Sequence, residues 1–228
     1  MKGNFIHLLP VSVYAVKLGL SEQERKHLIA HIDATHAQND NSNSESTWTG
    51  DVHGFHELHN HRAYLRLFGL ISEHIREYVT GLNVDTNAFD YYYTRSWATK
   101  QVQDKMIAHH RHDQSHISAV YYPRVPENSG DFYVATDNHQ NEIITGLFRP
   151  EYYETGVVKA GLAHSTAELP LKVEDDLLLI FPSKTAHRTG KSQSTEPRYS
   201  IATDLICVLK NADDWEIGLP PLHTWRKS

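Results

Sequence analysis

The sequence predicts an α+β fold in which helices come first and many short strands follow. Residues 21–32 and 58–81 carry helical signals, whereas the chain after Phe89 is rich in aromatic and β-branched residues, which favour strands. Turn signals built from Gly, Pro, Asn and Asp separate the expected strands. Helices grouped before strands are typical of a β-sandwich or barrel packed against helices.

Both predicted helices have identifiable ends. Ser21 and Glu24 form a capping box, so a helix is expected to start there and to end near Ile32. In residues 58–81, apolar side chains recur at helical spacing, and Gly81 is a candidate C-cap. The recurring residues are Leu58, Leu65, Phe68, Ile71, Ile75 and Val79.

Five strand segments are predicted after the helices, each bounded by turn signals. They are residues 89–97, 117–122, 131–136, 177–181 and 199–208. The fourth segment, Leu177 to Phe181, is a continuous apolar run, which indicates a strand covered on both faces. Pro123 is expected to stop the second strand.

We expect one domain with three parts: a helical N-terminal part (1–88), a strand-rich core (89–208) and an irregular surface tail (209–228). The 228 residues contain no internal repeat and no interdomain linker, and one domain accommodates this length. The polar stretch 34–51 is expected to be a loop, because it has almost no apolar side chains to bury. The residues before the first helix are expected to contain an early strand.

Composition argues against several classes of partner. The net charge of -6 gives no electrostatic reason to expect nucleic acid. Cys207 is the single cysteine, which excludes an intramolecular disulfide and suits a reducing cytoplasm, so a cytoplasmic location is expected. No apolar run reaches the length of a membrane span, and the N-terminus lacks a signal-peptide core. The sequence carries no signal for the oligomeric state.

Histidine is the compositional outlier, at 17 residues, and a few histidines fall where strands would bring them together. His110 and His112 are two positions apart, so on a strand they point to the same side. Two imidazoles held in this way form half of a metal site. His187, which follows an apolar strand and a Pro-Ser turn, is the best candidate for a third ligand. Three ligands on one side with open positions opposite suit catalytic iron.

Arg198 and Ser200 indicate an anionic ligand beside this metal. A guanidinium is a planar fork that matches a carboxylate, and the Ser200 hydroxyl on the same face of the strand can add a hydrogen bond. Arg198 stands at the start of an otherwise apolar strand, where a charge is unexpected unless an anion meets it. The residues therefore predict a divalent metal with a small dicarboxylate next to it.

These segments resemble the Fe(II)/2-oxoglutarate-dependent oxygenases, in particular a prolyl-hydroxylase-like group with the pattern H-x-H-x-x-S-x-x-S-[GA]-V-Y-Y. The match covers about residues 90 to 208. Its parts are residues 110–122, Ser129-Gly130-Asp131-Phe132, residues 178–183, His187 and Arg198-Tyr199-Ser200-Ile201.

The resemblance implies a double-stranded β-helix core of the jelly-roll or cupin type. It also implies a dioxygenase that hydroxylates a small-molecule or peptidyl substrate and releases succinate and CO2. The cofactors would be Fe(II) and the co-substrate 2-oxoglutarate, with O2 as the oxidant. His110 and His187 would be iron ligands, while Arg198 and Ser200 would bind the far carboxylate of 2-oxoglutarate and Tyr122 would donate to it.

One position departs from the pattern of the wider family, which has Asp or Glu where this chain has His112. Three neutral imidazoles leave the site one negative charge poorer. We take His112 as the ligand, although Asp113 could replace it if the strand bulges, and water could fill the position instead.

Two other functions stay open at this point. One is a three-histidine dioxygenase of the cupin type, which needs no co-substrate and hence no Arg198 anchor. The other is a metal-binding or ligand-binding module without catalysis, which the missing carboxylate would permit.

Overall fold

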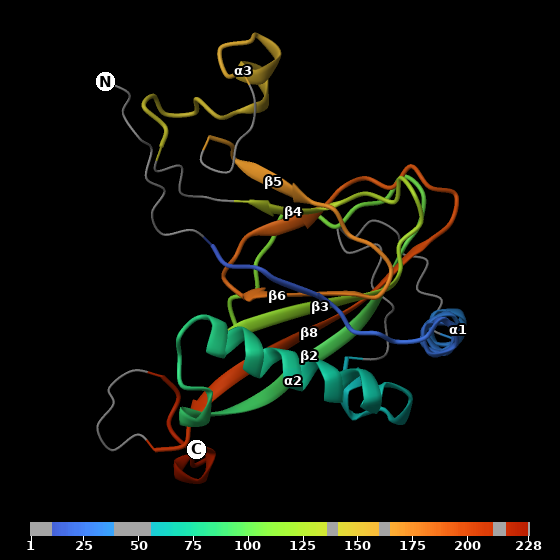
Figure 1. Ribbon diagram of the computed structural model, residues 1–228, viewed down its shortest axis with the longest axis vertical. Helices are drawn as coiled ribbons and strands as arrows, with labels where there is room; N and C mark the ends of the chain where they lie inside the picture. Colours follow the sequence, from blue (N-terminus) through green and yellow to red (C-terminus); the bar gives the residue numbers. More distant parts are fainter. Residues whose placement is uncertain (1–10, 39–55, 136–140, 160–164, 212–217, 228) are drawn as a thin grey trace.

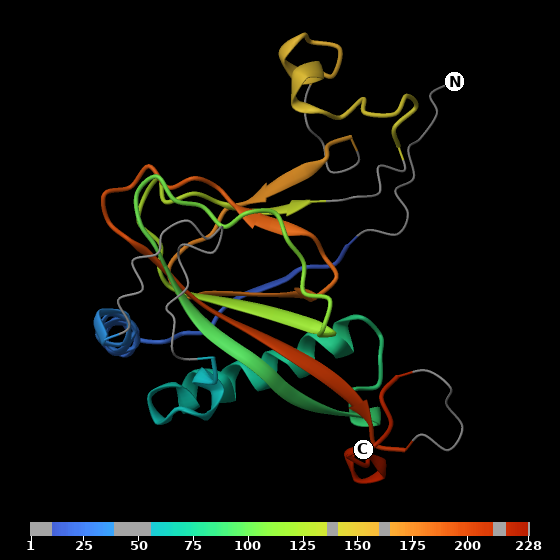
Figure 2. The same ribbon diagram turned by 180° about the vertical axis from the view of Figure 1, so that it is seen from behind.

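Two antiparallel sheets face each other, and the two long helices that come first in the chain cover the outer face of the larger sheet (Figures 1 and 2). The computed structural model describes residues 11–38, 56–135, 141–159, 165–211 and 218–227. The larger sheet has the strand order β1-β6-β3-β8-β2, and the smaller sheet has the order β5-β4-β7. This arrangement confirms the predicted α+β class.

The elements have the following bounds. The larger sheet contains β1 (Tyr14–Lys17), β2 (Phe89–Gln101), β3 (Ile117–Arg124), β6 (Leu177–Pro182) and β8 (Arg198–Leu209). The smaller sheet contains β4 (Phe132–Ala135), β5 (Glu168–Leu171) and β7 (His187–Thr189). The helices are α1 (Glu22–Gln38), α2 (Leu65–Gly81) and α3 (Pro150–Glu154), with short 3-10 turns at Leu58–Asn60, Arg62–Tyr64, Thr86–Ala88 and Leu222–Thr224. None of the helices in the described ranges has both the length and the apolar character needed to cross a membrane.

Side-chain alternation divides the larger sheet between two cores. Ala119 and Tyr121 of β3 point outward and pack with α1 and α2. Val120 and Tyr122 of the same strand point inward and pack with Phe132 of the smaller sheet. The apolar run of β6 is buried along its length, as the sequence predicts for a strand covered on both faces.

The first helix starts where the capping box predicts but continues beyond its predicted end. The Ser21 N–H donates to the Glu24 carboxylate at 2.8 Å, and the Glu24 N–H donates to the Ser21 hydroxyl at 3.3 Å. Helix α1 then passes Ile32, its last buried residue, and ends at Gln38. Residues after Ile32 include good helix formers that need no buried face, so the apolar pattern ends before the helix does. The first part of the predicted 34–51 loop is therefore helical, and residues 39–51 lie outside the described residues.

The second helix starts later than the apolar spacing predicts. Residues 58–64 form two 3-10 turns, and α2 begins only at Leu65 before ending at Gly81 as expected. The backbone before α2 bonds to β2 in addition to making its own 3-10 turns. The His59 N–H donates to the Ser96 hydroxyl at 2.9 Å, and the Ser96 N–H donates to the His56 carbonyl at 3.0 Å.

The strands differ from the predicted segments mainly at their ends. Strand β3 runs through Pro123 to Arg124, so Pro123 does not stop it. Pairing with β8 shifts register between Tyr121 and Arg124, and a proline costs no ladder hydrogen bond at such an irregularity. Strand β5 was not predicted, because it has only four residues and one of them is Pro170.

Candidate active site

Three histidines from two separate segments meet between the sheets. His110 and His112 lie in the connection between β2 and β3, which is extended but is not a regular strand as predicted. The N–H of His110 donates to the carbonyl of His187 at 3.0 Å, and the reverse bond is 2.9 Å. The His112 N–H donates to the Ser183 carbonyl at 3.0 Å. These bonds hold the connection extended, so the two imidazoles still share one side.

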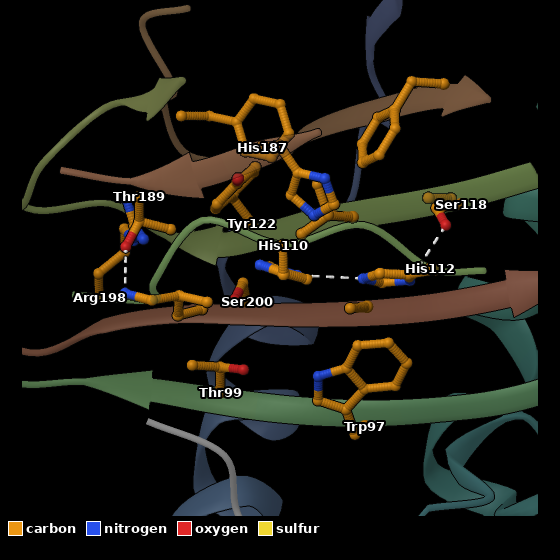
Figure 3. A pocket seen from close by; sticks show the side chains of 16 residues that line it. Trp97, Thr99, His110, His112, Ser118, Tyr122, His187, Thr189, Arg198 and Ser200 are labelled. Carbon is orange, nitrogen blue, oxygen red and sulfur yellow. Dashed lines mark hydrogen bonds between the residues drawn. The ribbon is translucent and has the colours of Figure 1, made fainter. Parts of the chain in front are cut away.

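The three imidazoles are spaced as the ligands of one metal ion would be. Their ligand atoms all lie within 4.8 Å of one another. Nε2 of His110 and Nε2 of His112 are 3.1 Å apart (Figure 3). Two nitrogens bound to one metal at about 2.1 Å and at a right angle would lie about 3 Å apart. The donor set therefore fits a divalent metal.

The protonation of the rings also fits a metal. Nδ1 of His110 donates to the Ala108 carbonyl and Nδ1 of His187 donates to the Thr185 carbonyl, each at 2.8 Å. These bonds leave Nε2 of each ring without a proton, as metal ligation requires. Burial lowers the pKa of His110 to about 4 and that of His187 to about 3, so both rings are neutral at physiological pH.

The structure brings His112, and not Asp113, into the cluster. Nδ1 of His112 lies 2.6 Å from Oδ1 of Asp204, which leaves its Nε2 facing His110 without a proton. Two such acceptors at 3.1 Å cannot bond to each other, whereas a cation between them would satisfy both. Asp113 points to solvent, where its carboxylate pairs with Arg111 at 2.9 Å.

Arg198 is buried, and it donates hydrogen bonds to two neutral groups. It is 1% exposed, and its Nη1 donates to the Gly130 carbonyl at 2.5 Å while Nη2 donates to the Gln101 side chain. Among the described residues, no carboxylate forms an ion pair with it. Burial lowers its pKa from the usual value. An unpaired buried charge costs several kcal/mol, roughly, so this arrangement suits an anionic ligand.

One cavity contains both the histidine cluster and Arg198 (Figure 3). Its empty space is about 500 Å³ when the open mouth is counted. Tyr122 and Ser200 lie beside Arg198, and burial raises the pKa of Tyr122 to about 12, so its hydroxyl is a donor at neutral pH. The other polar lining residues are Thr99, Ser118 and Thr189, and the aromatic and aliphatic walls include Trp97, Ile107, Val120, Phe132 and Phe181.

Sequence analysis missed two buried residues that hold Arg198 and His112 in place. Gln101 accepts from Arg198 and from the Thr189 hydroxyl at 3.1 Å, and its amide donates to two backbone carbonyls. Asp204 accepts from His112. A signal was present in the strand parity, because Asp204 has the same parity as Arg198 and a polar residue facing a core needs a partner.

Gly130, whose carbonyl binds Arg198, has no room for a side chain. Its φ is +85°, and a Cβ would lie 2.4 Å from the Gly190 carbonyl oxygen. We expect Gly130→Ala to lower the free energy of unfolding by clearly more than Gly19→Ala, measured by urea denaturation. Gly19 is a matched control because its φ is +74° with nothing within 4 Å, so it carries only the left-handed strain of about 1–2 kcal/mol. Equal losses in the two variants would contradict the steric reading.

The sequence matches a family model described as "Putative 2OG-Fe(II) oxygenase" over residues 95–204. This range is just under half of the chain, and it is similar to the 2-oxoglutarate- and Fe(II)-dependent oxygenases. This oxygenase is thus an enzyme whose cofactors are Fe(II) and the co-substrate 2-oxoglutarate. The matched range includes the three clustered histidines together with Tyr122, Arg198 and Ser200. No curated protein matches the sequence.

Solved structures share the fold of the oxygenase at low sequence identity. The non-heme alpha-ketoglutarate-dependent epimerase SnoN from nogalamycin biosynthesis aligns with a TM-score of 0.57 at 14% identity, covering 86% of this chain and 78% of SnoN. HygX from Streptomyces hygroscopicus, with nickel and 2-oxoglutarate bound, gives 0.53 at 12% identity and covers 92% of each chain. A Pseudomonas putida prolyl-4-hydroxylase gives 0.52 at 13% identity, covering 86% and 92%. These likenesses confirm the expected double-stranded β-helix core.

Proposed function

We propose that this oxygenase hydroxylates a small-molecule or peptidyl substrate and releases succinate and CO2. The observation that carries the proposal is a single cavity with three converging imidazoles at one place and a buried, unpaired arginine at another. The first group suits Fe(II), and the second suits the carboxylate of a bound dicarboxylate.

In this proposal His110, His112 and His187 hold Fe(II) through their Nε2 atoms. Arg198 holds the far carboxylate of 2-oxoglutarate, and Ser200 and Tyr122 add hydrogen bonds to it. When bound, Fe(II) and 2-oxoglutarate supply the oxidation, in which one oxygen atom of O2 converts the co-substrate to succinate and CO2 and the other enters a substrate C–H bond. The chain itself orients these groups.

The apolar walls of the cavity support this proposal, because they surround the groups that would hold the metal. Phe132 and Phe181 pack against the ring of His187, with centroid distances of 5.3 and 5.0 Å. They exclude water beside the metal-facing nitrogen, which strengthens the interactions of the charged groups inside. Trp97 lies 5.6 Å from the ring of His112 and forms another wall of the same cavity.

Succinate formation tests the proposal directly. Anaerobically purified protein should form succinate when Fe(II), 2-oxoglutarate and O2 are added, and Fe(II) should tighten the binding of 2-oxoglutarate. With ¹⁸O2, one labelled oxygen should appear in succinate. A parallel sample with a metal chelator is the control. No succinate together with no effect of Fe(II) on 2-oxoglutarate binding would overturn the proposal.

A three-histidine dioxygenase without a co-substrate is the second candidate, because the cluster contains no carboxylate. Such an enzyme would consume O2 with its substrate whether or not 2-oxoglutarate is present. The buried Arg198 argues against it, since that chemistry needs no dicarboxylate anchor. A non-catalytic binding module would bind metal in the same experiment and form no succinate.

A further inference from the structure

We propose that Asp204 is a positioning residue that acts on the metal through His112. It supplies the negative charge that a carboxylate ligand brings at this position in the wider family. The proposal rests on the ligand set proposed above. It concerns the one position where the chain departs from the two-histidine, one-carboxylate pattern. The negative charge then lies on Asp204, one imidazole further from the metal than a carboxylate ligand would be.

Asp204 is held close to His112 by the pairing of two strands. It lies on β8 directly opposite Ser118 on β3. Its side chain is buried on the inner face, with 8% of the residue exposed. Oδ1 lies 2.6 Å from Nδ1 of His112 and 2.7 Å from the Ser118 hydroxyl oxygen. Nδ1 of His112 also lies 3.2 Å from the Ser118 oxygen, but the shorter contact with Asp204 takes its proton.

A chain of serine hydroxyls points its protons toward this carboxylate. Ser115 donates to Ser183 at 2.9 Å, Ser183 and Ser118 are 2.9 Å apart, and Ser118 donates to Asp204. Each hydroxyl has one proton, so Ser183 must donate to Ser118, whose own proton is already used. Every donor in the chain therefore faces Asp204, as expected for an anionic acceptor at its end.

The other two histidines have backbone acceptors at Nδ1. Nδ1 of His110 and Nδ1 of His187 donate to backbone carbonyls, which are neutral. The carboxylate thus acts on His112, the residue that stands where the wider family has its carboxylate ligand. A carboxylate acceptor at Nδ1 increases the basicity of the imidazole and fixes its orientation toward the metal.

The test replaces the charge and keeps the shape. Asp204→Asn retains an oxygen that can accept from His112 but carries no charge. We expect its affinity for Mn(II), measured by anaerobic titration calorimetry, to fall about 10- to 100-fold. We also expect the Fe(III)/Fe(II) potential of the iron-loaded protein to become more positive, because a lost negative charge destabilises Fe(III) more than Fe(II).

A buried carboxylate elsewhere provides the matched control. Asp176 is 9% exposed and accepts from the Tyr121 hydroxyl at 2.8 Å and from the Gly19 N–H at 2.7 Å. Asp176→Asn should lower the stability of the fold. It should change the metal affinity by less than about twofold and leave the potential unshifted, because Asp176 does not contact the cluster.

A second background separates an effect through His112 from a defect of the fold. In His112→Ala the imidazole that contacts Asp204 is absent. We expect Asp204→Asn to lower Mn(II) affinity clearly less in that background than in the wild-type background. A purely structural role would lower the affinity by the same factor in both, and such a result would overturn the proposal.

The two proposals fail in different ways. If the wild-type protein binds no metal at the cluster and forms no succinate, the proposed function fails and takes this inference with it. If the wild-type protein binds metal and forms succinate while Asp204→Asn changes neither affinity nor potential, only the role of Asp204 is wrong.

Discussion

His112→Ala is expected to weaken Fe(II) binding by more than about 100-fold, whereas Asp113→Ala should change it by less than about twofold. Mutating a residue that hydrogen-bonds to a metal ligand typically lowers metal affinity about 10- to 100-fold. The His112→Ala loss should be larger, because this variant removes a ligand itself. Asp113 has no such role in the structure, since 68% of its side chain is exposed and its carboxylate pairs with Arg111.

Anaerobic titration with Fe(II) or Mn(II) measures both variants against the wild type. Thermal unfolding of the metal-free proteins is the control, because a loss of fold would also remove metal binding. If only Asp113→Ala abolished binding, the connection between β2 and β3 would have to rearrange on metal binding, and our ligand assignment would be wrong.

Arg198→Ala is expected to raise the Kd of 2-oxoglutarate at least about 30-fold while metal affinity stays within about threefold. Truncating one partner of a buried, hydrogen-bonded charge pair costs about 2 kcal/mol or more, which corresponds to this factor. Ser200→Ala removes one hydroxyl and should cost less, about three- to tenfold, since a single hydrogen bond contributes about 0.5–1.5 kcal/mol.

Arg198→Lys tests whether the loss in Arg198→Ala comes from the missing guanidinium or from a disturbed fold. Arg198 also bonds to Gly130 and Gln101, so the alanine variant loses internal contacts as well. Lysine keeps the positive charge but not the planar fork, and its 2-oxoglutarate affinity should fall between wild type and alanine. Titrations with 2-oxoglutarate in the presence of Mn(II) give the affinities. Equal losses of metal and 2-oxoglutarate binding would mean that Arg198 supports the fold and does not anchor the co-substrate.

Sequence patterns located the elements of the fold better than their ends. The apolar run at Leu177–Phe181 predicted a doubly covered strand, because burial on both faces requires continuous apolar residues. Helix α1 outlasted its apolar pattern, since a solvent-exposed turn needs only helix-forming residues. Residues 58–64 do not form the predicted α-helix, because their backbone bonds to Ser96 on β2, which lies far away in the sequence.

Part of the site could also be predicted from local sequence patterns. His110 and His112 share a side by local parity, which requires only an extended backbone. The roles of Gln101 and Asp204 could not be predicted in this way, because each bonds to a residue in a distant segment of the chain. Which distant residues meet is decided by the fold and not by local spacing. Asp113 illustrates the limit: its chemistry suits iron, and only the course of the connection shows that it faces solvent.

The order of strands in the larger sheet has a consequence for how the chain folds. Strand β8 is the last strand of the described sequence, yet it lies between β3 and β2. Until β8 leaves the ribosome, β2 has no strand partner among the described residues, and β3 has one open edge, a condition that favours aggregation. The same strand brings both Arg198 and Asp204. Insertion of the final strand therefore closes the sheet and completes the cavity in one step, so a nascent chain cannot assemble the full site before its fold is finished.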